Sequence, residues 1–176
     1  AHEQTVVHDY AVVYDALGGC VTGGGWINSP SGAYTPNDNS DTDLTGKAHF
    51  GFISKYKKGQ TVPSGSTNFS FAAGDLEFDS TAYEWMIITG ARARYKGEGT
   101  VEGMPGTFKF QVTALDAGIS GEGITEDGFR IKIWRAGAGD TENVLYDNGR
   151  GADDSTGNGG TTPLGGGSIK VHKAKN

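Results

Sequence analysis

The chain has 176 residues and a formal net charge of −6, a size that suits one domain with a sizeable core. The negative charge argues against nucleic acid and anionic membranes as partners, and no stretch reaches the roughly 18 apolar residues of a membrane span. The sequence has 30 glycines and only short apolar runs, which indicates many turns and favours an all-β protein over a helical one.

The first predicted element is a run of β-branched and aromatic residues from Thr5 to Asp15. Its apolar residues fall on both faces, so this strand needs cover on both sides. We therefore treat residues 1–15 as an N-terminal strand that docks either within its own domain or onto a neighbouring copy of the chain.

Two glycine triplets, Gly23–Gly25 and Gly165–Gly167, each adjoin an apolar, strand-like stretch. Glycine is unfavourable inside a strand unless a bulge, a bend or the close approach of another backbone requires it. Neither triplet is followed by a helix-forming run or by the Gly-Lys-Ser/Thr of a phosphate-binding loop. We predict that the two stretches lie side by side and join the ends of the chain.

Between the triplets, apolar and polar residues alternate in a series of short segments separated by turns. This alternation places Phe52, Phe71, Phe110 and Ile131 on the inward faces of their strands. The fold class predicted for residues 1–176 is a single antiparallel β-sandwich, jelly-roll-like, with about ten or eleven strands. The strands predicted between the triplets are 47–56, 68–72, 76–79, 83–89, 91–100, 107–115, 129–135 and 144–146.

Several motifs together resemble a domain of secreted bacterial proteins that often follows hyalin-repeat or PKD-type immunoglobulin-like repeats. The resemblance implies an extracellular, non-catalytic module, and it supplies no active site. Cys20 stands where that family commonly has an aromatic residue, and the loop 37–43 is longer than usual. The resemblance covers nearly the whole chain and rests on Val12-Val13-Tyr14-Asp15, Val21-Thr22-Gly23-Gly24-Gly25-Trp26-Ile27, Gly46-Lys47-Ala48-His49-Phe50-Gly51-Phe52, Ser54-Lys55-Tyr56-Lys57-Lys58-Gly59, Phe129-Arg130-Ile131-Lys132-Ile133-Trp134, Tyr146-Asp147-Asn148 and Leu164-Gly165-Gly166-Gly167-Ser168-Ile169.

Two features bear on where the protein works. The chain begins with Ala1 rather than Met, as expected if a signal peptide has been removed or the sequence has been trimmed. Its single cysteine, Cys20, forms no internal disulfide, and we expect a small buried hydrophobic residue there rather than a nucleophile. A secreted or cell-surface location is therefore predicted from composition and from the resemblance.

Two loops carry clusters of acidic residues that suit calcium, which prefers carboxylate and loop carbonyl oxygens. Neither loop has the glycine and glutamate positions of an EF-hand. Solvated acidic turns are the alternative for both loops. The candidate calcium ligands are Asp38, Asp41 and Asp43 in the first loop and Asp147, Asp153 and Asp154 in the second.

Basic side chains alternate along several predicted strands and point outward. If these strands are neighbours, they form a basic patch that suits an anionic polysaccharide, with arginines on carboxylate or sulfate groups and a tryptophan stacked on a sugar. The alternative is a cross-strand charge ladder, with Glu77, Asp79 and Glu98 opposite the bases. The candidate ligand-binding residues are Arg92, Arg94, Lys96, Lys109, Arg130, Lys132 and Trp134.

The sequence contains no Gly-x-Ser-x-Gly and no other catalytic signature, so we expect a binding protein rather than an enzyme. The leading hypothesis is a secreted module that binds extracellular carbohydrate. The alternative is an adhesion or self-assembling subunit, in which the N-terminal strand of one copy completes the sheet of the next.

Overall fold

The computed structural model describes residues 19–36, 42–137 and 143–173. In this part of the chain, ten strands form one antiparallel sheet in the order β10-β1-β2-β3-β4-β5-β6-β7-β8, and β9 pairs with β7. The strands are β1 (Cys20–Ser29), β2 (Gly46–Lys55), β3 (Ser64–Phe71), β4 (Leu76–Thr89), β5 (Arg92–Val101), β6 (Phe108–Leu115), β7 (Gly128–Arg135), β8 (Val144–Asp147), β9 (Thr162–Pro163) and β10 (Gly166–His172), with a short 3-10 helix, η1 (Ala72–Gly74), between β3 and β4.

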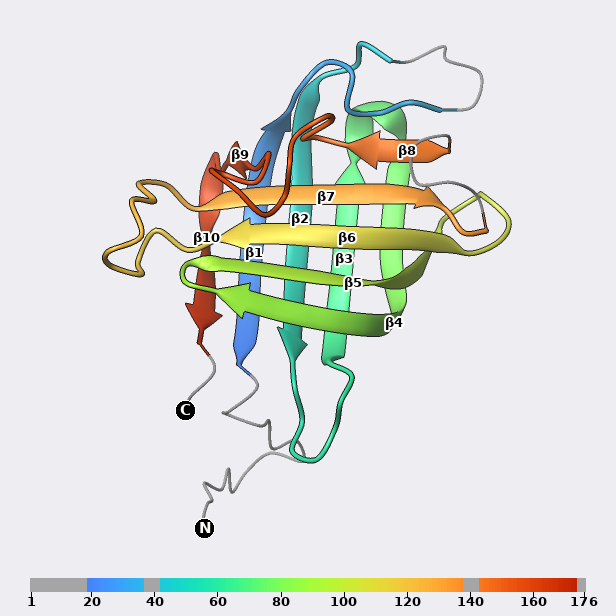
Figure 1. The fold of residues 1–176 in the computed structure, drawn as a ribbon. Coiled ribbons are helices and arrows are strands. Elements are labelled where there is room, and N and C mark those ends of the chain that lie inside the picture. The colour runs from blue at the N-terminus through green and yellow to red at the C-terminus, as the bar shows by residue number, and fades with distance from the viewer. Residues whose placement is uncertain (1–18, 37–41, 138–142, 174–176) are drawn as a thin grey trace.

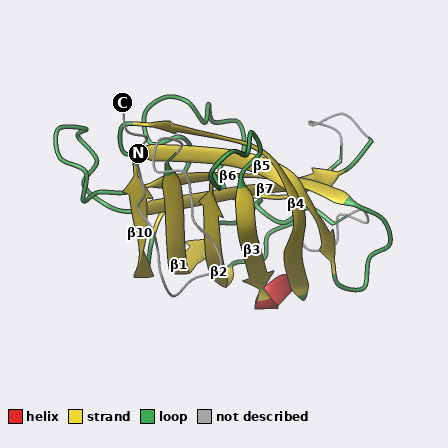
Figure 2. Ribbon diagram, turned by 90° about the horizontal axis from the view of Figure 1, so that it is seen from below, coloured by secondary structure: helices red, strands yellow, loops and turns green. Residues whose placement is uncertain are grey.

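The sheet folds back on itself into two layers whose strands cross steeply (Figures 1 and 2). One layer contains β10, β1, β2 and β3, and the other contains β5 to β8. The long strand β4 belongs to both layers, because Leu76–Asp79 pair with β3 and the rest of the strand pairs with β5. Two register shifts against β5, at residues 80–82 and 83–85, mark bulges that bend β4 at the corner. The two strands expected at 76–79 and 83–89 are thus one.

The predicted all-β, antiparallel, sandwich-like fold of about ten strands is confirmed. Its connections differ from those of a jelly roll, in which two Greek keys alternate between sheets. From β1 to β8, each strand pairs with the next in sequence, and β10 then returns to lie beside β1. From β1 to β8 the chain is therefore a meander, because each connection, whether a short turn or a longer loop, leads directly into the neighbouring strand.

The two glycine triplets lie side by side, as predicted. In the ladder between β1 and β10, Gly25 is opposite Gly167 and Trp26 is opposite Gly166. A Cβ atom on Gly25 would lie 2.1 Å from the carbonyl oxygen of Gly166, and one on Gly165 would lie 2.1 Å from the Trp26 ring. Close approach of two backbones and one indole ring therefore requires glycine here.

Aromatic rings from both layers fill the space between them. The Phe50 ring of β2 stacks on the Phe129 ring of β7 with a centroid separation of 4.0 Å. All four side chains predicted to point inward are buried, namely Phe52, Phe71, Phe110 and Ile131. Cys20 is also buried, and this burial raises the pKa of its thiol. The expectation that Cys20 behaves as a small buried residue is therefore confirmed.

The edge of the sheet at β10 is closed by two carboxylates from the loop between β6 and β7. Asp127 accepts a hydrogen bond of 2.9 Å from the backbone N–H of Ile169. Asp116, which is buried, accepts one of 2.8 Å from the N–H of Val171. These backbone groups face away from β1, so the carboxylates occupy the positions that another strand would use.

Two other edges of the sheet are covered in part. A bridge between Tyr34 and Tyr146 lays the segment 33–35 along β8. Beyond its corner, β4 pairs only with β5, and there the Tyr56 hydroxyl donates to the carbonyl oxygen of Met86 at 2.9 Å and accepts from its N–H at 3.2 Å. The predicted N-terminal strand, residues 1–15, lies outside the described residues. No helix within the described ranges is long and apolar enough to cross a membrane.

Candidate ligand-binding face

The outer face of β5, β6 and β7 carries the predicted basic residues. The three strands are neighbours, so Lys96 of β5, Gln111 of β6 and Lys132 of β7 form one row across the sheet. Arg94, Thr113 and Arg130 form the next row, and Lys109 lies opposite Trp134 in the row on the other side. In the structure, the seven candidate residues therefore lie on one face, the outer face of these strands.

The loop between β8 and β9, residues 148–161, is bonded to this face by the arginines. Arg92 donates to the carbonyl oxygen of Ser155 at 2.8 Å. Arg94 forms an ion pair of 3.1 Å with Asp154, which also accepts a hydrogen bond from Gln111. Arg92 and Arg94 of the basic patch thus bind the loop 148–161 of the protein itself.

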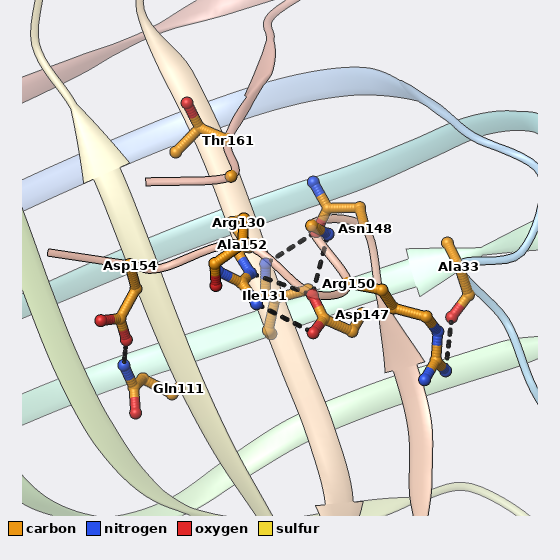
Figure 3. Close-up of polar contacts among 12 residues, drawn as sticks. Ala33, Gln111, Arg130, Ile131, Asp147, Asn148, Arg150, Ala152, Asp154 and Thr161 are labelled. Atoms are coloured by element: carbon orange, nitrogen blue, oxygen red, sulfur yellow. Dashed lines mark hydrogen bonds and ion pairs between the residues drawn. The ribbon is translucent and has the colours of Figure 1, made fainter. Parts of the chain in front are cut away.

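Arg130 forms the buried centre of these contacts (Figure 3). Its Nε and Nη2 atoms each donate to Asp147 at 3.0 Å, in the two-pronged geometry that a guanidinium and a carboxylate prefer. Its Nη1 atom donates to the carbonyl oxygens of Ala152 and Gly159, both at 3.1 Å. The side chains of the pair are only 9% and 5% exposed, so neither is available to an external ligand.

Asn148 and Arg150 extend the anchoring of the loop. The Asn148 side chain accepts from the N–H of Ile131 and donates to the carbonyl oxygen of Phe129, both at 2.9 Å, so it acts as a short substitute for a neighbouring strand (Figure 3). Arg150 donates to the carbonyl oxygen of Gly32 at 2.8 Å. The loop is therefore tied to both layers of the fold.

These contacts bring together residues from two separate predictions. Arg92, Arg94 and Arg130 were predicted to bind a ligand, whereas Asp147 and Asp154 were predicted to bind calcium. The structure pairs Arg130 with Asp147 and Arg94 with Asp154. Alternation along a strand carries no information about which loop lies over that strand. The sequence pattern therefore could not show that these arginines and aspartates neutralise each other.

Of the remaining candidate metal ligands, Asp153 and Asp43 belong to the described residues. Asp153 is exposed and accepts hydrogen bonds from the N–H and hydroxyl of Ser155, and these bonds lower the pKa of its carboxyl group. Asp43 is exposed in the other loop, while Asp38 and Asp41 lie outside the described residues. Within residues 19–36, 42–137 and 143–173, no three acidic, histidine or cysteine side chains are placed to hold a metal ion. A calcium site remains a prediction.

Lys109 takes part in a cross-strand charge ladder, which was the alternative to ligand binding for the basic residues. Its ammonium group forms ion pairs with Glu84 of β4 and, at 2.8 Å, with Glu98 of β5. Hydrogen bonds to Glu84 and then to Glu98 raise the pKa of the lysine. Glu77 and Asp79 do not take part, because they lie opposite Ser70 and Thr100, respectively.

Lys96, Lys132 and Trp134 make up the rest of the predicted patch. The ammonium groups of the two lysines lie 5.4 Å and 5.1 Å from the centroid of the Trp134 ring. Neither lysine forms an ion pair with a carboxylate of the described residues. Trp134 is only 3% exposed, so it is not the open stacking surface for a sugar that the sequence predicted.

A small cleft adjoins these lysines. It has a volume of about 210 Å³ and lies between the outer face of β6 and β7 and the loop segment 152–154. Lys132, Gln111 and Thr113 line the side toward the sheet, and Asp153 and Asp154 line the side toward the loop. A larger hollow of about 430 Å³ lies among Glu122, Glu126 and Asp127 at the end of the sheet, where the acidic lining disfavours an anion.

Three residues of the face were absent from the candidates: Glu84, Gln111 and Asn148. Alternation along β6 predicted that Gln111 points outward, so its place on the face was available from the sequence. Glu84 lies within the second bulge of β4, between Tyr83 and Trp85, where the alternation shifts. Asn148 bonds to a strand that is distant in sequence. Comparisons with protein-family models, with curated proteins and with solved structures gave no match.

Proposed function

We propose that the chain is an extracellular, non-catalytic module that binds polysaccharide on the outer face of β5, β6 and β7. The observation that carries the proposal is the cleft beside Lys132, a cation without an ion-pair partner among the described residues. Hydroxyl, amide, carboxylate and ammonium groups lining one cleft are the donors and acceptors that sugar hydroxyl groups require.

The rigid backing of the cleft supports this function. A sugar binds weakly at each contact, so a prearranged surface saves the cost of ordering side chains and loops on binding. Here the loop wall is fixed by Arg94, which holds Asp154, and by Arg130, which holds the carbonyl groups of residues 152 and 159. The arginines thus contribute by shaping the cleft, while Lys132 faces the ligand.

The closed sheet edges favour a binding module over an assembly subunit. Addition of a donor strand requires a row of free N–H and C=O groups at a sheet edge. At β10, the segment from Ile169 to Val171 offers no such row, because Asp116 and Asp127 accept from its outward N–H groups. Tyr56 similarly occupies both backbone groups of Met86 on β4.

Affinity electrophoresis through gels that contain neutral or acidic polysaccharides tests the proposal. The wild-type protein should be retarded by at least one of them, and Lys132→Gln should reduce this retardation. Lys170→Gln is the matched control, because Lys170 is an exposed lysine on β10 in the other layer and its loss changes the net charge equally. A failure of every polysaccharide to retard the wild-type protein would overturn the proposed function.

A further inference from the structure

The cations of the binding face differ in whether their charge is already compensated. Arg94 and Arg130 pair with aspartates of the loop, and Lys109 pairs with two glutamates. Arg92 has no carboxylate partner but donates to carbonyl groups of the loop, whereas Lys96 and Lys132, which lie in the same row of the sheet, have neither a carboxylate nor a loop carbonyl partner among the described residues. Two uncompensated charges therefore stand together on a protein whose formal net charge is −6.

Both ammonium groups lie near the same aromatic ring, that of Trp134. Both lie within 5.4 Å of the centroid of the Trp134 ring. Their strands are separated by β6, so their Cα atoms are roughly 10 Å apart, twice the usual strand spacing. The two long side chains, which come from the strands on either side of β6, thus contact the same indole ring, and both are half-buried.

The positive charge of the two lysines is not balanced by a carboxylate of the described residues. Two ammonium groups over one ring repel each other, and cation–π attraction compensates only part of the repulsion. An anionic group between them would remove the repulsion and accept charge-assisted hydrogen bonds from both. Because an ammonium group is a compact charge with rotatable donors, the pair suits a carboxylate or a sulfate without requiring a planar, two-pronged partner.

On the basis of the function proposed above, we propose that the face selects acidic sugars, and that Lys96 and Lys132 jointly hold an anionic group of the polysaccharide over Trp134. The adjacent cleft then takes the hydroxyl groups of the neighbouring sugar unit. The carboxylates on the loop wall oppose this arrangement only in part, because Asp154 is paired with Arg94 and the charge of Asp153, which is exposed, is screened by solvent.

Titration calorimetry with three probes tests this inference: an oligogalacturonate, its neutral methyl ester, and a sulfated oligosaccharide. We expect the oligogalacturonate or the sulfated probe to bind at least about tenfold more tightly than the methyl ester, since hydrogen bonds to a charged acceptor are roughly twice as strong as those to a neutral one. Binding of one charged probe but not the other identifies the anionic group as carboxylate or sulfate. The double variant Lys96→Gln/Lys132→Gln should lose this preference, whereas Lys170→Gln should retain it.

Tryptophan fluorescence locates the anion independently. Binding beside Trp134 should change the emission of the wild-type protein, and the variant Trp134→Phe should lose that change while it still melts cooperatively, at a lower temperature because a buried ring becomes smaller. If the methyl ester binds as tightly as the acidic probes, and the double variant binds like wild type, the inference is overturned but polysaccharide binding stands. If none of the probes and no polysaccharide in the electrophoresis binds, both proposals fail.

Discussion

Arg130 determines whether the loop over the binding face stays in place. Its guanidinium group is buried and is bonded to Asp147 and to two loop carbonyl groups. A buried ion pair contributes little net stability compared with apolar residues of the same size, but removal of one partner leaves the other charge uncompensated. The pair therefore fixes the position of the loop more than it adds to the stability of the fold.

The variant Asp147→Asn should be strongly destabilised for this reason. The buried guanidinium would keep its charge without a carboxylate, which costs about 3–5 kcal/mol in the free energy of unfolding. Urea denaturation at neutral pH measures the effect. Asp153→Asn is the control, since Asp153 is exposed and bonded only to its local turn. Equal stability of Asp147→Asn and wild type would show that Arg130 finds another partner or reaches water.

The buried tyrosines predict how stability depends on alkaline pH. Burial raises the pKa of Tyr83 to about 12 and the pKa of Tyr95 well above its ordinary value. In the unfolded chain both ionise near pH 10, so above that pH the folded state binds more protons and the free energy of unfolding falls. The loss is about 1.4 kcal/mol per pH unit for each tyrosine, and for Tyr83 it ends near pH 12.

Urea denaturation at a series of pH values from 8 to about 11 checks this dependence. Tyr95→Phe cannot ionise and should therefore show a shallower fall in stability than wild type. The comparison is valid even if the variant is less stable at pH 8, where it loses the 2.7 Å hydrogen bond between Tyr95 and Thr67. Parallel curves for the two proteins would contradict the assignment of the slope to Tyr95.

At the scale of the elements, the edge strand β10 depends on two side chains from another part of the chain. The variant Asp127→Ala removes the acceptor for the N–H of Ile169, and a buried donor without a partner costs about 1–3 kcal/mol. Hydrogen exchange should accelerate at Ile169. The amide of Lys170, which belongs to the ladder opposite Thr22 of β1, is the internal control. Unchanged exchange at Ile169 would mean that the carboxylate does not close the edge.

The elements also show what the sequence could predict. Alternation identified most of the strands and the buried faces of Phe110 and Ile131, because a side chain's face depends only on its own strand. The corner in β4 was missed, since its bulges interrupt the alternation and divide one strand into two apparent ones. The partners of Arg94 and Arg130 were missed because the loop that bonds them is more than a dozen residues away in sequence, and alternation contains no such information.

At the scale of the whole molecule, the two layers have different roles. The layer of β5 to β8 presents the lysines and supports the anchored loop, and the layer of β10 to β3 closes the core behind it. The rings of Phe50 and Phe129 join the layers. This division explains why the binding face can be polar on its outer side, since the opposite side of the same strands supplies the apolar core.

The ladder between β1 and β10 has a consequence for the order in which the molecule forms. From β1 to β8 each ladder joins strands that follow one another along the chain, whereas this ladder brings Cys20 opposite His172. Local hairpins close quickly, and contacts between distant segments must first overcome the entropy of closing a long loop. We therefore expect the glycine-lined ladder to form late in folding, so that substitutions within it should act mainly on the unfolding rate.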